Sequence, residues 1–293
     1  MENNTENNQL SSSVTFTDQE RDTKTPGEAI LNEAQALFAE HGFIRLVNVF
    51  DPKTIDEWDK HYRRRYKSFL QSYDRGERPL FTVDVEGPFS DPYFFANPLI
   101  GMVTNKFLGD DHILAALSSV VSFPDAPDQF IHRDTEPIFG KNYSVDVCLP
   151  PYSITVLIPL VDCNLETGCT KVVPGSHRLP RYSPKSPFID PEVRKGSVLI
   201  TDGRLVHRGG ANLSSRIRPL LYMTYHRKWF RDFGGYEERP PINVSNRVLK
   251  NIPREYRHMF DWTKDPYRLI RLKTFLRRIL PVRFTKRTGT ASN

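Results

Sequence analysis

The 293-residue sequence predicts a mainly β protein with flanking α-helices, and three observations lead to this fold class. Short runs rich in β-branched and aromatic residues begin after residue 112, with Pro and Gly turns between them. Proline accounts for 23 of the 293 residues, which is above the roughly 5% average of globular chains. Helical periodicity, in contrast, occurs before residue 110 and after residue 243. Many short strands separated by such turns are typical of a sandwich, a barrel or a jelly roll.

Three helices are expected ahead of the β-rich part, over residues 26–41, 51–73 and 98–107. In the first, apolar residues recur at helical spacing and Gly42 supplies the stop. Asp51 and Pro52 fit the N-cap and the first helical position of the second helix. The expected strands cover residues 43–50, 113–123, 129–133, 153–161, 171–173, 197–201, 205–208 and 220–225.

The chain is expected to contain one folded domain between two different ends. Residues 1–25 are rich in Asn, Ser, Thr and charge, so they are expected to be disordered. Residues 26–263 are expected to form the folded domain with its helical flanks, and residues 264–293 a basic amphipathic helix and tail.

Composition excludes several classes of protein. No run of about 18 apolar residues is present, so no membrane-spanning helix is expected. The polar start lacks the apolar segment of a secretory signal. The three cysteines form no CxxC pair, which excludes a disulfide scaffold and a cysteine-only zinc site. This cysteine usage fits a reducing compartment, and a cytoplasmic location is expected.

The net charge of +6 suggests nucleic-acid binding only until its location is considered. Residues 264–293 hold nine basic residues and one acidic residue, which leaves a net charge of −2 for residues 1–263. We therefore expect no nucleic-acid partner. Residues 265–281 combine an apolar stripe with a basic face. Such a helix can lie on a membrane surface or a partner, dock on the protein's own sheet, or contribute to a homodimer.

The strongest chemical signal is the pair His132 and Asp134 in a predicted strand. Residues two apart on a strand point to the same face, so an imidazole nitrogen and a carboxylate oxygen can share one metal ion. His207, in another predicted strand, is the candidate third ligand. Two histidines and one carboxylate with open positions describe the facial triad of non-haem Fe(II) oxygenases.

Arg218 follows His207 by eleven residues, after a turn that can fold the next strand back. An inward guanidinium needs an anionic partner, and a carboxylate gripped through two hydrogen bonds is the natural one. His226 shares this alternation, although a structural role is the ordinary expectation for it. The alternative for Arg218 is a surface position, as expected for Arg216.

Together these residues resemble the phytanoyl-CoA dioxygenase family over about residues 29–229. The similar blocks are His132-x-Asp134, residues 166–177, residues 196–200, and residues 207–214 followed by Arg218. The resemblance implies a double-stranded β-helix, or jelly roll, that uses Fe(II), 2-oxoglutarate and O2. It implies His132, Asp134 and His207 as iron ligands, Arg218 as the partner of the distal 2-oxoglutarate carboxylate, and Gln129 and Thr170 as further cosubstrate contacts.

The resemblance also implies a reaction class. The expected activity is oxidation, above all hydroxylation, of a small organic metabolite, with succinate and CO2 as coproducts and a role in specialised metabolism as one option. Halogenating relatives have a small residue in place of the carboxylate, so Asp134 argues against chlorination. Gln129 precedes His132 by three residues, so in a regular strand the two side chains would point to opposite faces. A bulge or bend would be needed to bring both to one side. The alternative function is a catalytically silent, cupin-like binding or regulatory protein.

Overall fold

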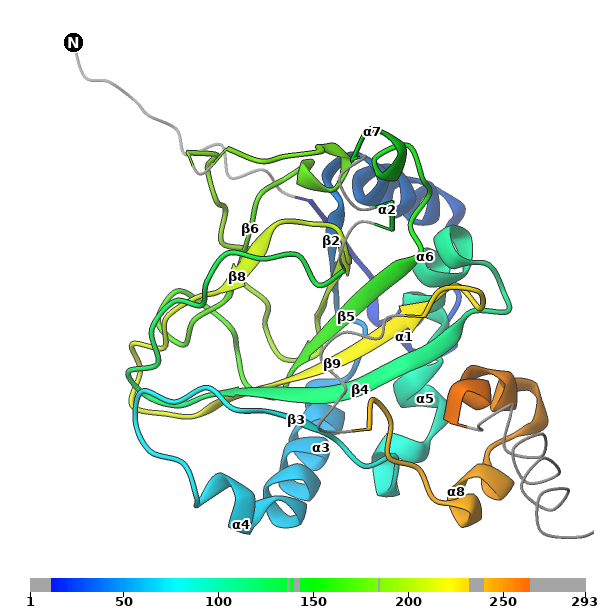
Figure 1. The fold of residues 1–293 in the computed structure, drawn as a ribbon. Helices are drawn as coiled ribbons and strands as arrows, with labels where there is room; N and C mark the ends of the chain where they lie inside the picture. Colours follow the sequence, from blue (N-terminus) through cyan, green and yellow to red (C-terminus); the bar gives the residue numbers. More distant parts are fainter. Residues whose placement is uncertain (1–11, 136–137, 140–142, 184, 232–239, 264–293) are drawn as a thin grey trace, which may run out of the picture.

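The computed structural model describes residues 12–135, 138–139, 143–183, 185–231 and 240–263. Within this part of the chain, one seven-stranded sheet has the order β1–β2–β7–β5–β9–β4–β3, and β6 pairs with β8 in a second sheet. The strands are β1 (Ser13–Thr15), β2 (Phe43–Val47), β3 (Leu80–Thr82), β4 (Ile113–Ser122), β5 (Ser153–Pro159), β6 (Thr170–Val172), β7 (Val198–Asp202), β8 (His207–Gly209) and β9 (Arg218–His226). The expected mainly β fold with helical flanks is therefore confirmed (Figure 1).

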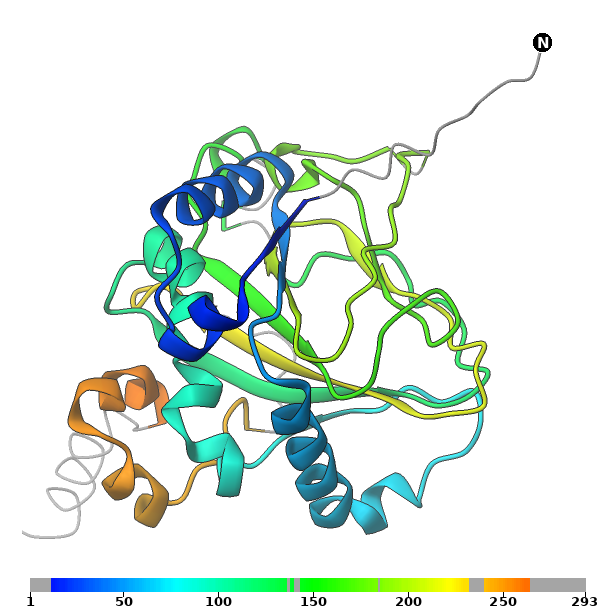
Figure 2. The ribbon, with the colours of Figure 1, turned by 180° about the vertical axis from the view of Figure 1, so that it is seen from behind.

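Helices cover one face of the large sheet, as the view from behind shows (Figure 2). The helices of the described residues are α1 (Asp18–Thr23), α2 (Glu28–His41), α3 (Pro52–Arg65), α4 (Lys67–Leu70), α5 (Pro92–Phe95), α6 (Pro98–Leu108), α7 (Tyr143–Asp146) and α8 (Asn246–Asn251), with the 3-10 segments η1 (Gly87–Ser90), η2 (Ser176–Arg178) and η3 (Arg254–Thr263). The sequence signals act as expected at their ends. The Asp51 carboxylate caps α3 by accepting from the Lys53 amide at 2.8 Å, and Gly42 ends α2 with φ 76°.

The alternation along β9 separates the two faces of the large sheet. Leu221, Met223 and Tyr225 belong to the main core under the helices. Leu220 points the other way and joins a second core, together with Leu157 of β5 and residues of the small sheet. We call this second face the inner face, because it is enclosed between the two sheets.

The expectation of a disordered start is wrong for residues 12–25. β1 pairs in parallel with β2, and α1 begins with a capping box formed by Thr17 and Glu20. Phe16 is 1% exposed and belongs to the main core. The polar composition conceals this because only two large apolar side chains, those of Val14 and Phe16, anchor the segment.

We expect Phe16→Ala to lower the free energy of unfolding by about 3–5 kcal/mol, the usual cost of deleting a buried phenylalanine ring. The control is Thr15→Ala, because Thr15 is exposed and its change should cost about 0.5 kcal/mol or less. Urea denaturation of both variants measures the difference. Equal stability of the two variants would show that this segment does not belong to the domain.

The strand expected around His132 and the helix expected near the C-terminus have different outcomes. The strand predicted over residues 129–133 is reduced to one isolated bridge between His132 and His207. The helix expected over residues 265–281 lies outside the described residues. Among the described residues, no helix is both long and apolar enough to cross a membrane.

Candidate metal and cosubstrate site

The backbone places His132 and His207 side by side. Each amide donates to the carbonyl of the other residue, at 3.0 Å from His132 and 2.9 Å from His207. This antiparallel bridge brings the two imidazole rings to a centroid separation of 4.4 Å. Two histidines that are 75 positions apart in the chain therefore act as neighbours.

Hydrogen bonds to the backbone orient both imidazole rings. His132 Nδ1 lies 2.9 Å from the carbonyl oxygen of Phe130, and His207 Nδ1 lies 3.0 Å from that of Leu205. A carbonyl can only accept, so each Nδ1 carries the proton and each Nε2 offers a lone pair. Such a partner on the second nitrogen is the usual arrangement for a metal-binding histidine.

Asp134 supplies the oxygen donor. Its Oδ1 lies 3.3 Å from His207 Nε2 and 3.8 Å from His132 Nε2, while its Oδ2 accepts from the Thr155 hydroxyl at 3.2 Å. The three donor atoms all lie within 4.8 Å of one another, and no other such group occurs among the described residues. His207 is buried, whereas His132 and Asp134 are half-buried, so one side of the triad stays open. The donor set fits a divalent iron ion.

The pKa values of the triad reflect strong mutual interactions. Burial acts to raise the pKa of Asp134, but attraction to His207 and His132 outweighs it, and the pKa lies below its ordinary value. Burial acts to lower the pKa of His207, but Asp134 outweighs it, so this pKa is raised. For His132, burial and the neighbouring His207 both lower the pKa. A carboxylate that stays ionised between two imidazoles can bind a cation.

Arg218 lies on the inner face at the start of β9 and is 2% exposed. Its Nε is 3.4 Å from the Thr167 carbonyl oxygen, and no carboxylate among the described residues lies within ion-pair distance of its guanidinium. A buried guanidinium is costly without an anion, so the position favours an external carboxylate.

A second cation, Arg78, precedes β3, and sequence reasoning assigned no ligand to it. Its Nη2 donates to the carbonyl oxygens of Pro127 and Gly210, both at 2.8 Å, whereas its buried Nε and Nη1 have no partner. Burial, followed by repulsion from Arg218, lowers the pKa of Arg78 to about 10. Two neighbouring guanidiniums create a place for an anion. Local sequence gives no signal of this, because the pairing of β3 with β4 positions Arg78.

Gln129 and Thr170 both lie beside β8. The Gln129 side-chain oxygen accepts from the Gly209 amide at 2.9 Å, so a bent segment, not a strand, decides its direction. A Cβ on Gly209 would lie 2.4 Å from that oxygen and 2.2 Å from Arg78 Nη1, so the ends of both side chains pack directly against Gly209. Thr170 is paired with Gly209 and lies next to the Tyr222 hydroxyl, whose pKa burial raises to about 12.

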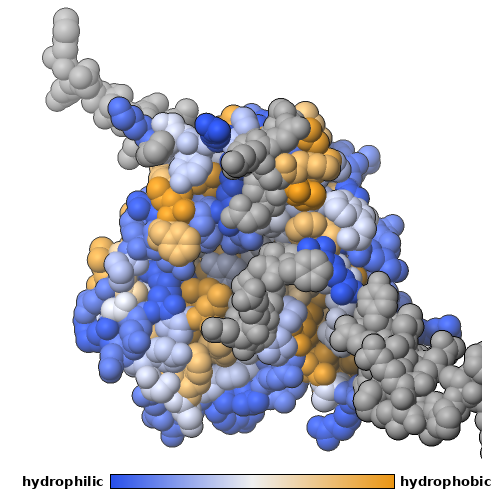
Figure 3. All heavy atoms as spheres, viewed as in Figure 1, coloured by the Kyte–Doolittle hydropathy of each residue, from blue (hydrophilic) through white to orange (hydrophobic). Residues whose placement is uncertain are grey.

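An exposed apolar side chain lies next to the metal candidate. Phe130 is 78% exposed, and its ring centroid is 4.9 Å from that of His132. Phe139, five residues after Asp134, is 52% exposed. On the face shown in Figure 3, apolar patches alternate with hydrophilic ones. The exposed ring of Phe130 therefore offers an apolar contact beside His132.

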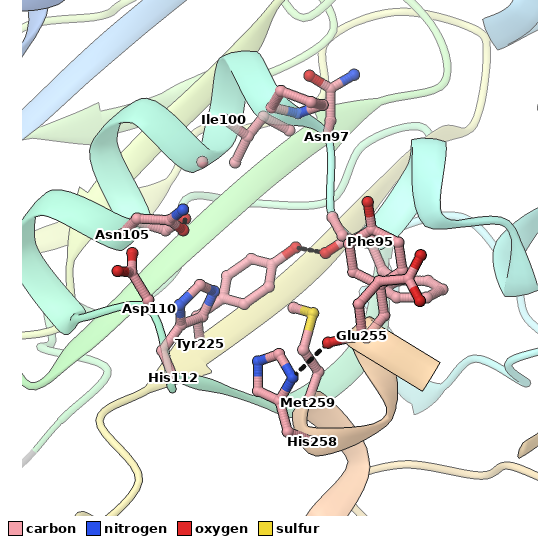
Figure 4. Close-up of a pocket in the computed structure, with 15 residues that line it drawn as sticks. Phe95, Asn97, Ile100, Asn105, Asp110, His112, Tyr225, Glu255, His258 and Met259 are labelled. Carbon is pink, nitrogen blue, oxygen red and sulfur yellow. Dashed lines mark hydrogen bonds between the residues drawn. The ribbon is translucent and has the colours of Figure 1, made fainter. Parts of the chain in front are cut away.

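A separate cavity of about 240 Å³ lies on the helix-covered face. Figure 4 shows Tyr225, whose hydroxyl donates to the Phe95 carbonyl at 2.8 Å, with His112 and His258 around it. Because Tyr225 alternates with Thr224 and His226, the large sheet separates this cavity from the metal candidate. The cavity therefore takes no part in the site described above.

Two histidines and one carboxylate on the inner side of such a fold are the metal ligands typical of non-haem Fe(II) oxygenases. The family model "Phytanoyl-CoA dioxygenase (PhyH)" matches residues 38–220, so the chain belongs to this family and the resemblance seen in the sequence is confirmed.

Two of the curated relatives come from Aspergillus species. The chain is 33% identical over 118 residues to "Dioxygenase trt7" of Aspergillus terreus, covering 39% of this chain and 41% of that protein. It is 32% identical over 120 residues to "Fe(II)/2-oxoglutarate-dependent dioxygenase nvfF" of Aspergillus novofumigatus, covering 40% of each. The matched segments thus span about two fifths of either relative.

A solved structure supports the fold. The non-haem α-ketoglutarate-dependent epimerase SnoN from nogalamycin biosynthesis superposes with a TM-score of 0.52 at 19% identity. The superposition covers 68% of this chain and 84% of that protein. The predicted jelly roll is therefore confirmed.

Proposed function

We propose that the protein is an Fe(II)/2-oxoglutarate-dependent dioxygenase that hydroxylates a small organic metabolite. The observation that carries this proposal is the triad, whose three donor atoms lie within 4.8 Å. Family membership and the printed function of the nvfF relative support the cofactors. The fungal relatives and the biosynthetic origin of SnoN favour a role in specialised metabolism.

His132, Asp134 and His207 would hold the iron through Nε2, Oδ1 and Nε2. When bound, iron and 2-oxoglutarate supply the oxidation in which O2 converts a C–H bond to C–OH, with succinate and CO2 as coproducts. The protein orients its ligands beforehand, since the Phe130 and Leu205 carbonyls fix both imidazole tautomers. Thr155 holds the second carboxylate oxygen of Asp134 and keeps Oδ1 directed at the histidines.

Arg218 would bind the distal carboxylate of 2-oxoglutarate, because its guanidinium is buried on the inner face without a carboxylate partner in the described chain. Arg78 adds a second positive charge and two unpaired donors beside it. Thr170, Gln129 and the Tyr222 hydroxyl border the same space and offer hydrogen bonds. These groups orient the cosubstrate and keep its negative charge compensated.

Calorimetric titration of 2-oxoglutarate into the Mn(II)-loaded protein under nitrogen tests this function. We expect one 2-oxoglutarate per chain and at least tenfold weaker binding without metal, since the proposed site uses both the triad and Arg218. Binding of equal strength with and without metal would separate the cosubstrate from the triad and contradict the proposal.

Arg78→Met should raise the KM for 2-oxoglutarate by about tenfold, the effect of losing one charge-assisted contact of about 1.5 kcal/mol. The matched control is Arg75→Met, because Arg75 is 64% exposed and pairs with Asp125 at the surface. Steady-state succinate formation at varied 2-oxoglutarate measures both values. An unchanged KM in Arg78→Met would remove this arginine from the cosubstrate site.

We further propose a small-molecule substrate, a cytoplasmic location and no nucleic-acid partner. The exposed ring of Phe130 beside the triad supports the first, and the charge distribution supports the last. Docking of residues 265–281 on a membrane surface or in a homodimer stays a prediction. A silent binding protein is the weaker alternative, because His132, Asp134, His207 and Arg218 are all present and the first three are assembled.

A further inference from the structure

Two unpaired polar atoms, His226 Nδ1 and Ser153 Oγ, are buried at one end of the inner face. The two residues oppose each other in the β5–β9 ladder and are 3% and 2% exposed. Ser153 shares its face with Thr155, which holds Asp134. The pair therefore lies on the metal side of the sheet, about 7 Å beyond Thr155 along the strand.

A glycine connects this pair to the metal candidate. The amide of Thr135, the residue after Asp134, donates to the Gly203 carbonyl at 2.9 Å. A Cβ on Gly203 would lie 2.3 Å from Thr135 Oγ1 and 2.9 Å from Ser153 Oγ. Both hydroxyls thus approach one point, and the missing side chain at residue 203 leaves room for them.

Aromatic rings pack beside His226. The His226 ring lies 4.9 Å from Phe230 and 5.6 Å from Trp262, measured between centroids. Tyr152 lies 4.6 Å from Phe230, and Trp229, at 6.0 Å from the same ring, is 64% exposed. Flat apolar walls around a few hydrogen-bonding atoms are typical of sites for ring-containing ligands.

The electrostatics restrict the kind of group that fits. Burial lowers the pKa of His226 to about 3, so its imidazole is neutral at physiological pH. A neutral imidazole and a hydroxyl can each donate and accept one hydrogen bond, but they cannot compensate a charge. Burial without a partner is unfavourable for both groups, so a ligand that supplies the partner gains affinity from it.

We propose that His226 and Ser153 form a substrate subsite for a neutral oxygen, a carbonyl or a hydroxyl, of a ring-containing substrate. This inference rests on the proposed function, because it places the remote end of the substrate of that same site. The subsite orients the molecule while the carbon to be oxidised faces the triad. His226 is then a positioning and specificity residue, and it exchanges no proton with the reacting atoms.

The test compares two rigid probes, 9-fluorenone and fluorene, which differ only in a carbonyl oxygen that replaces a CH2 group. Equilibrium dialysis against the full chain loaded with Mn(II) and 2-oxoglutarate gives both affinities. We expect the wild type to prefer 9-fluorenone about tenfold, and His226→Phe to lose this preference while it still binds fluorene. His226→Gln, which keeps hydrogen-bonding atoms, should retain part of the preference.

The matched control is His112→Phe. His112 is also a buried histidine, but its Nδ1 has a partner in the Gly109 carbonyl at 2.8 Å, and it lies on the opposite face (Figure 4). His112→Phe should therefore keep the preference and lower the melting temperature. His226→Phe should not lower it, because no hydrogen bond of Nδ1 is lost.

Two results would overturn the subsite: equal wild-type affinity for both probes, or a preference that survives in His226→Phe. A melting temperature that falls as far in His226→Phe as in His112→Phe would also overturn it, by revealing a structural partner. Failure of the proposed function has a different signature, because the wild type would then not bind 2-oxoglutarate in the presence of Mn(II), whatever its preference between the probes.

Discussion

Replacing His207 by alanine is expected to abolish tight Fe(II) binding and, with it, the formation of succinate. The structure predicts this because Nε2 of His207 is one of three donors, and it lies 3.3 Å from Oδ1 of Asp134. Loss of a residue that supports a metal ligand typically lowers metal affinity by about 10- to 100-fold. Loss of the ligand itself should therefore lower it further. His132→Ala and Asp134→Ala should behave alike. Metal content after anaerobic dialysis against Fe(II) measures the effect without relying on activity.

Two further variants make this prediction specific. Thr155→Val removes only the hydrogen bond to Asp134 Oδ2, so its metal affinity should fall by about 10-fold, between wild type and the ligand variants. His258→Ala is the matched histidine control, because His258 is half-exposed and its hydrogen bond within the described chain goes to its own segment, at the Glu255 carbonyl. One equivalent of tightly bound iron in His207→Ala would show that the triad is assigned incorrectly.

Arg218→Ala should raise the KM for 2-oxoglutarate by about 100-fold or more and change iron affinity little. Removing one partner of a buried charge pair costs about 2–5 kcal/mol, and each 1.4 kcal/mol is a factor of ten. The effect should exceed that of Arg78→Met, because Arg218 is 2% exposed whereas Arg78 is half-buried and keeps two backbone partners. Steady-state kinetics at varied 2-oxoglutarate measures it.

Arg216 provides the control for Arg218. It lies two residues earlier in the chain and is exposed, so Arg216→Ala should leave the KM unchanged. A comparable rise of the KM in both variants would point to a general loss of positive potential. An unchanged KM in Arg218→Ala would place the cosubstrate carboxylate elsewhere.

The metal candidate could be predicted from the sequence because each of its two motifs lies within a short stretch of the chain. His132 and Asp134 stand two residues apart, and Arg218 follows His207 by eleven residues, although the strand of Arg218 does not fold back beside that of His207 but lies in the other sheet. Helix starts such as Asp51-Pro52 were predictable for the same reason, since a cap depends on neighbouring residues. The strand expected around His132 is only a bridge, yet the two histidines still meet, because the bridge itself supplies the backbone pairing.

The remaining features depend on long-range pairing. Arg78 reaches the site because β3 pairs with β4, some 40 residues later in the chain, and nothing near residue 78 predicts this. The order of residues 12–25 depends on β1, a three-residue strand that becomes stable only beside β2. Periodicity gives His226 an inward direction, but only the structure shows that its Nδ1 is buried without a partner.

Succinate formation tests the central claim most directly. The wild-type protein is incubated with Fe(II), 2-oxoglutarate and O2, and succinate is measured by ¹H NMR beside Asp134→Ala. We predict slow succinate formation by the wild type even without an added substrate, and none above background by Asp134→Ala. A wild-type protein that binds Fe(II) and 2-oxoglutarate but forms no succinate under any of these conditions would contradict the assignment as an oxygenase and favour the silent binding protein.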